Sequence, residues 1–103
     1  MTTAVIDDRG YPLPAFRLGT VQKVAYTGTA GTISNAVGSQ TRMVRVVATT
    51  ACHIVVGAAP TATTSHSYLP ADTVEYLAVN GGSDKVSAIQ VASGGTIYVT
   101  ELE

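Results

Sequence analysis

The pair Cys52–His53 places a nucleophile directly beside a base, the combination that cysteine hydrolases use. The run around it, ACHIVVG, is typical of a β-strand, in which neighbouring side chains point to opposite faces. The thiol and the imidazole therefore cannot form a hydrogen bond with each other. Together with His66, the pair also lacks the spacing and the fourth ligand of a zinc site. We expect a buried, structural Cys52 and predict no metal site.

The residue types of a serine-hydrolase triad occur at Ser65, His66 and Ser67, with Asp72 and Asp84 further along the chain. Neither a G-x-S-x-G nucleophile elbow nor an oxyanion-hole pattern accompanies them. Serine-rich loops contain such combinations by chance, so we predict no catalytic residue here.

A glycosidase would need a pair of carboxylates, and the chain offers Glu75, Glu101 and Glu103. A chain of 103 residues offers little cleft to hold them around a sugar, and we expect Glu101 and Glu103 at a fraying terminus. The glycines follow neither G-x-G-x-x-G nor a P-loop pattern. The sequence therefore predicts no enzyme, no cofactor and no small-molecule substrate.

Short β-rich runs alternate with Gly, Ser, Asn and Thr turns from Thr20 to the end of the chain. We expect strands over residues 20–27, 31–37, 42–49, 51–57, 73–79, 85–92 and 95–102. Residues 42–57 are predicted to form a hairpin, because Thr49–Thr50 joins two strong strand patterns tightly. The long connection 58–72 is expected either to bind something or to contain a short edge strand within 65–69.

This rhythm of strands predicts an all-β fold: one antiparallel β-sandwich or jelly-roll-like domain over residues 19–103, with a closed barrel as the alternative. The runs 51–57 and 73–79 carry apolar residues on both faces, whereas a monomer with one solvated face alternates more cleanly. Burial in a homo-oligomer or against a partner would produce this pattern, and so would a small closed barrel.

Residues 1–18 have a different character, since Pro12 and Pro14 impose an extended path. We expect an extended N-terminal arm that either lies over its own domain or docks on a neighbouring subunit. The apolar candidates for partner contact in this arm are Ile6, Tyr11, Leu13 and Phe16.

The basic residues are few and scattered, and the formal net charge is −1. This balance argues against a nucleic-acid partner, which would require a basic surface. Arg42 and Arg45 lie on opposite faces of one expected strand. They either guard a β-prone segment against aggregation or contact an acidic partner surface. Tyr68 is a further candidate for partner contact.

No apolar run approaches the length of a spanning helix, and the first residues lack the basic start of a secretory signal. We therefore expect no membrane contact and synthesis in the cytoplasm.

A resemblance rests on the stretch 42–70, RMVRVVATTACHIVVGAAPTATTSHSYLP, followed by ADTVEYLAV and then KVSAIQVASGGTIYVTEL. It is similar to small proteins of tailed-bacteriophage virion gene clusters. Their pattern is R-x-V-R-V-V-A-T, C-H-I, P-T-A-T and L-P-A before an E-Y strand, then A-I-Q, a GG turn and a Y-V-T-E strand. The similarity covers about residues 40–103 and does not include the arm.

The resemblance implies a structural protein of the virion. The best-fitting role is a capsid decoration or cement protein, which binds the major capsid protein and assembles as a homotrimer. The alternative is a neck, tail or fibre-associated module that binds another virion protein or a host glycan. The resemblance assigns no catalytic, cofactor or metal residue.

Overall fold

The computed structural model describes residues 5–6, 12–13 and 17–102, the first two pairs by their backbone alone. Within these residues the chain is all β and contains no helix. The main strands are β3 (Leu18–Tyr26), β4 (Gly31–Thr32), β5 (Met43–Ala48), β6 (Cys52–Gly57), β7 (Ser67–Leu69), β8 (Glu75–Ala78), β9 (Lys85–Gln90) and β10 (Gly95–Leu102).

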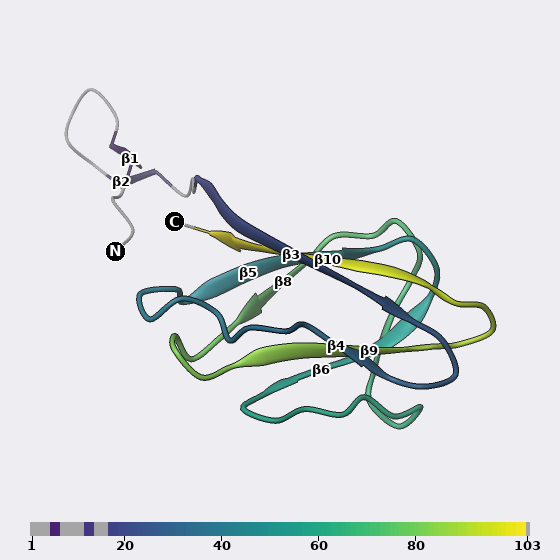
Figure 1. The fold of residues 1–103 in the computed structure, drawn as a ribbon. Coiled ribbons are helices and arrows are strands. Elements are labelled where there is room, and N and C mark those ends of the chain that lie inside the picture. Colours follow the sequence, from purple (N-terminus) through teal and green to yellow (C-terminus); the bar gives the residue numbers. More distant parts are fainter. Residues whose placement is uncertain (1–4, 7–11, 14–16, 103) are drawn as a thin grey trace.

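These strands form two four-stranded sheets that pack together (Figure 1). The first sheet has the order β3-β10-β5-β8 and the second has the order β4-β9-β6-β7. Every neighbouring pair in both sheets is antiparallel. From β3 onward, each connection except that between β6 and β7 carries the chain from one sheet to the other. The predicted all-β, antiparallel class is thus confirmed.

The predicted hairpin over 42–57 is wrong. β5 and β6 do not pair, because β5 belongs to the first sheet and β6 to the second. Residues 49–51 make a corner in which the Thr49 N–H donates to the Thr96 carbonyl oxygen at 3.0 Å. The apolar residues of both strands face one shared core from opposite sides. A short connection therefore serves here to cross between sheets rather than to reverse within one.

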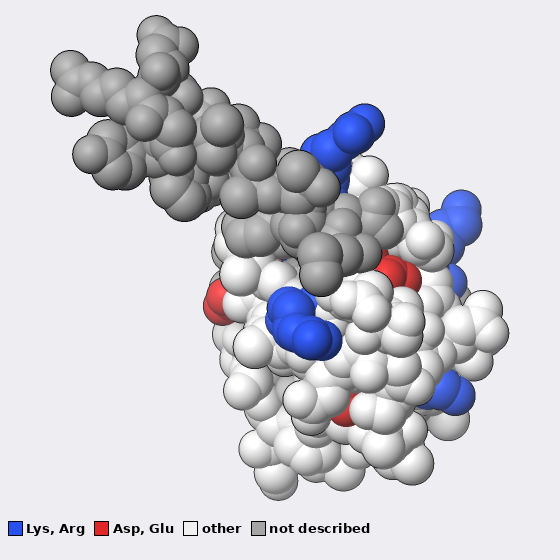
Figure 2. Space-filling view, turned by 90° about the vertical axis from the view of Figure 1, so that its left-hand side faces the viewer, with Lys and Arg blue, Asp and Glu red and all other residues white. Residues whose placement is uncertain are grey.

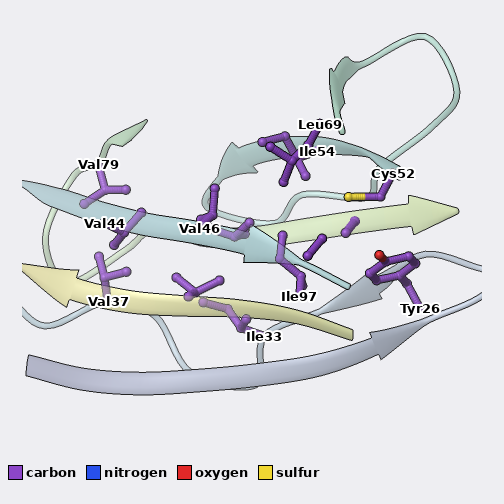
Figure 3. Close-up of a cluster of buried hydrophobic side chains, with 14 residues drawn as sticks. Tyr26, Ile33, Val37, Val44, Val46, Cys52, Ile54, Leu69, Val79 and Ile97 are labelled. Atoms are coloured by element: carbon purple, nitrogen blue, oxygen red, sulfur yellow. The ribbon is translucent and has the colours of Figure 1, made fainter. Parts of the chain in front are cut away.

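The core fills the space between the sheets (Figure 3). β5 alternates strictly between buried and partly exposed residues, as period-two side-chain geometry requires. The first sheet contributes Val44, Val46, Ala48, Ile97 and Val99. The second sheet contributes Cys52, Ile54, Leu69, Val86 and Ala88.

The expected strand over 31–37 is regular only at Gly31–Thr32. The rest continues beside β9 in irregular form: Ile33 N–H donates to the Val86 carbonyl at 3.1 Å, and Val37 N–H donates to the Asp84 carbonyl at 2.9 Å. Its side chains at 33 and 37 remain buried in the core. The edge strand expected within 65–69 is present as β7.

At the N-terminal side, β1 (Val5–Ile6) pairs with β2 (Pro12–Leu13) in antiparallel register (Figure 1). Among the sequence-predicted contact residues, Ile6 and Leu13 therefore lie in paired backbone, whereas Tyr11 and Phe16 lie outside the described residues. β3 starts at Leu18, one residue inside the segment expected to be the arm. In the described part of the chain, no helix has the length and apolarity needed to cross a membrane.

Candidate interaction surface

The outer face of the first sheet carries a row of four side chains that crosses all its strands. Thr100 of β10 pairs with Val21 of β3 on one side and with Arg45 of β5 on the other. Arg45 in turn pairs with Tyr76 of β8. Cross-strand partners in an antiparallel sheet project to the same side. These four side chains therefore form one continuous band.

A second row lies beside the first. Tyr98 of β10 pairs with Lys23 of β3 and with Val47 of β5, two residues along the strands from the first row. The exposed fractions are 60% for Tyr76, 56% for Val21 and 37% for Tyr98. Large side chains are thus presented to solvent here, on a face where antiparallel sheets ordinarily carry polar residues.

We call these two rows the basic-aromatic face; its members are Val21, Lys23, Arg45, Val47, Tyr76, Tyr98 and Thr100, of which Thr100 is itself buried. The outward positions of the four strands include two cations and no Asp or Glu. Glu101 of β10 is on the inward side, and Glu75 of β8 pairs with the inward Val46. The basic-aromatic face therefore combines net positive charge with aromatic and apolar area. By comparison, the end of the molecule seen in Figure 2 is largely uncharged, with isolated basic and acidic side chains.

The outer face of the second sheet is different, because the β6–β7 connection folds over it. Ser87 of β9 points outward by its register with Val55, yet it is fully buried. Its hydroxyl accepts a hydrogen bond from the Ala62 backbone N–H at 2.9 Å. The Thr32 hydroxyl lies 3.1 Å from the Ser87 oxygen and 3.2 Å from the Pro60 carbonyl. Part of the long connection 58–72 thus serves to cover its own domain.

Tyr68 lies on this second sheet, on the opposite side of the molecule from Arg45. It pairs with His53 across β6 and β7, and the two rings meet edge to face with centroids 5.9 Å apart. The His53 Nδ1 lies 3.0 Å from the His66 carbonyl oxygen. Tyr68 is 56% exposed. It is therefore an isolated aromatic side chain rather than part of the basic-aromatic face.

Cys52 is fully buried in the core, while His53 next to it is partly exposed on the outer side. This arrangement confirms that the two side chains do not face each other. Burial raises the pKa of the Cys52 thiol and so disfavours the thiolate, the form that acts as a nucleophile.

The candidate triad residues have local structural partners. The His66 Nδ1 accepts a hydrogen bond from the Thr63 backbone N–H at 2.9 Å. Asp84 accepts one from the Asn80 N–H at 2.9 Å and is itself buried. Each side chain thus stabilises its own loop. Among the described residues, no group of three His, Cys, Asp or Glu side chains could hold a metal ion.

The expectation that Glu101 lies at a fraying terminus is wrong. It belongs to β10, a central strand held between β3 and β5, and is only 7% exposed. Its Oε1 accepts hydrogen bonds from the Gly38 N–H at 3.0 Å and from the Thr41 hydroxyl. The carboxylate thus anchors the turn before β5. It lies in an open groove of about 400 Å³ that is also lined by Gln22 and Asn35.

The structure separates the other sequence-predicted contact residues. Arg42 is exposed and immediately precedes β5, where its carbonyl accepts a hydrogen bond from the Val79 N–H at 3.0 Å. Only Arg45 lies on the basic-aromatic face. Sequence reasoning missed Lys23, Tyr76 and Tyr98 as its neighbours. The period-two pattern gives the side of each strand, but only the pairing of distant strands brings these side chains together.

No protein-family model matches the chain, and no curated protein matches it either.

Proposed function

We propose that the chain is a non-enzymatic structural protein of a bacteriophage virion, specifically a capsid decoration protein that binds the assembled head shell. The resemblance over residues 40–103 suggests the virion as its location. The observation that carries the proposal is the order of the strands in the two sheets.

Within this proposal, the fold is a jelly roll. When β3 to β10 are counted from one to eight, the sheets have the orders 1-8-3-6 and 2-7-4-5. This is the strand order of an eight-stranded jelly roll, an architecture that recurs in viral capsid and lectin domains. The order supports the jelly roll over the closed barrel, because each sheet ends in edge strands: β3 and β8 in one, β4 and β7 in the other.

The proposed partners are the major capsid protein and further copies of this chain in a homotrimer. The exposed aromatic and apolar side chains of the first sheet support contact with the capsid protein, since Tyr is enriched in protein interfaces. The arm residues Ile6, Tyr11, Leu13 and Phe16 stay candidates for contact with the shell. A protein that binds only the assembled lattice would stabilise it by mass action.

Light scattering and co-sedimentation test this function. The mass of the purified chain is measured first, and the chain is then centrifuged with purified shells that lack it. A trimer that sediments with intact shells, but not with unassembled capsid subunits, supports the proposal. A monomer that stays in the supernatant with every shell preparation overturns it.

A second candidate function is a tail or fibre module that binds a host glycan. The exposed ring of Tyr68, held edge to face by His53, favours it, since aromatic rings stack on sugars and jelly rolls include lectins. A glycan array tests this candidate. Binding that Tyr68→Ala abolishes supports the module, and an array with no signal rejects it.

A further inference from the structure

We infer that the basic-aromatic face is a docking surface for an extended acidic segment of another protein, in which carboxylates alternate with apolar side chains. The inference concerns the chemistry of the occupant and does not depend on whether that partner belongs to a virion.

The positions of the two cations define the spacing of the carboxylates. Lys23 and Arg45 lie on β3 and β5, which flank β10, so two strand spacings of about 4.8 Å separate them laterally. They also occupy neighbouring rows, about 7 Å apart along the strands. The diagonal distance between the backbone positions of Lys23 and Arg45 is therefore roughly 12 Å. This is close to the distance of about 13 Å that separates residues i and i+4 of an extended chain. An extended segment with acidic residues four apart would reach both cations.

The apolar part of the face lies between and beside these charges. Tyr98 pairs directly with Lys23, and Tyr76 pairs directly with Arg45. Each cation thus has an aromatic neighbour that can pack against the stem of an incoming side chain. Val21 supplies further exposed apolar area at the edge strand. Tyr and Arg are the residue types that most often carry binding energy at protein interfaces.

Charge complementarity argues against a second copy as the occupant. Two identical faces packed on each other would bring cations against cations without a carboxylate to neutralise them. The area is also small: four strands about 4.8 Å apart and about six residues long span roughly 15 by 20 Å. A stable dimer ordinarily buries about 800 Å² on each partner. The face thus fits a segment better than a whole subunit.

A nucleic acid fits less well, because the face offers only two cations and the chain has a formal net charge of −1. Binding to phosphate backbones needs a larger number of Lys and Arg contacts. A carboxylate segment is the occupant whose charge and apolar content both match.

Nuclear magnetic resonance titration of the full chain with a random copolymer of glutamate and tyrosine tests the inference directly. We expect saturable shifts of backbone amides concentrated in β3, β5, β8 and β10. Lys23→Glu or Arg45→Glu should weaken binding about fivefold or more, and added salt should weaken it further. Lys85→Glu is the matched control, since Lys85 lies in β9 of the second sheet and should leave the affinity unchanged.

Amide shifts centred on the second sheet, an equal loss with Lys85→Glu, or no saturable binding would each overturn the inference. The milder variants Lys23→Gln and Arg45→Gln, which remove the charge without reversing it, keep the test valid if a Glu variant misfolds. Sedimentation velocity examines the alternative occupant. Self-association that Tyr76→Ser abolishes would replace the acidic segment with a second copy.

Discussion

The phenol of Tyr26 donates a hydrogen bond of 2.6 Å to the backbone carbonyl of Thr50 and lies 3.3 Å from the Thr50 N–H, which donates to it. Tyr26 ends β3 in the first sheet, whereas Thr50 lies in the corner through which the chain crosses to the second sheet. The Thr50 hydroxyl is also 2.9 Å from the phenol oxygen. One buried side chain thus fixes both the carbonyl and the N–H of a crossover between the sheets.

Tyr26→Phe should lower the free energy of unfolding by about 1–3 kcal/mol, because it leaves the backbone groups of Thr50 without their partner. Urea denaturation measures this change. Tyr98→Phe is the control, since that hydroxyl lies on a partly exposed outer face, and its effect should stay within about 0.5 kcal/mol. Equal effects of the two substitutions would show that the phenol does not fix the crossover.

Glu101→Gln should also destabilise the protein, by about 1–2 kcal/mol, because hydrogen bonds to a charged acceptor are stronger than those to a neutral one. The effect should be local as well as global. The Gly38 amide, which donates to Glu101, should exchange its hydrogen faster in the variant. Glu75→Gln is the matched control because Glu75 is exposed in the edge strand β8. An unchanged exchange rate at Gly38 would contradict the anchoring role of Glu101.

Local sequence patterns were sufficient to predict most of the strands and the burial of several residues. The alternation around Val44, Val46 and Ala48 predicts a half-buried strand, and β5 has this pattern. The pattern failed at Thr49–Thr50, because a tight reversal within a sheet and a corner between sheets use similar residues and similar lengths. The hydrogen bonds of Tyr26, which is 24 residues away, distinguish the two.

Local sequence patterns could not predict the basic-aromatic face, for a related reason. Tyr98 and Lys23 are neighbours only because β10 inserts between β3 and β5, a pairing of segments far apart in the chain. Glu101 was misjudged on similar grounds, since a position near the end of the sequence proved to be in a central strand. Sequence separation alone does not determine which strands become neighbours in a sheet.

The stability of the protein should decrease as the pH rises above about 9. Burial raises the pKa of Cys52, and burial also raises the pKa of Tyr26 in spite of its hydrogen bonds to Thr50. The unfolded thiol ionises near pH 8.5 and the unfolded phenol near pH 10, whereas the folded groups keep their protons to higher pH. The contribution of both groups is therefore fully present below pH 8 and is lost as the pH passes their folded pKa values.

Urea denaturation between pH 7 and pH 10.5 checks this dependence. Each group that is ionised only in the unfolded state lowers the free energy of unfolding by at most about 1.4 kcal/mol per pH unit. Cys52→Ala should make the decline shallower between pH 8.5 and 10, whatever its effect at pH 7. A decline of the same slope in the variant would exclude the thiol as its source.

Ser87→Ala should loosen the connection 58–66 from the second sheet. The substitution removes the acceptor of the Ala62 N–H and the partner of the Thr32 hydroxyl, both within a covered region. The expected loss is about 1–2 kcal/mol of unfolding free energy, since a buried N–H is left unpaired.

Limited proteolysis separates a local from a global effect of this substitution. Cleavage of Ser87→Ala should begin within 58–66, at a rate above that of the wild-type protein, while the strands stay protected. Ser83→Ala, in an exposed turn, should be cleaved like the wild type. If Ser87→Ala is instead cleaved throughout its sequence at once, Ser87 supports the whole sheet. The connection would then be a structural layer of the domain rather than a cover that opens independently.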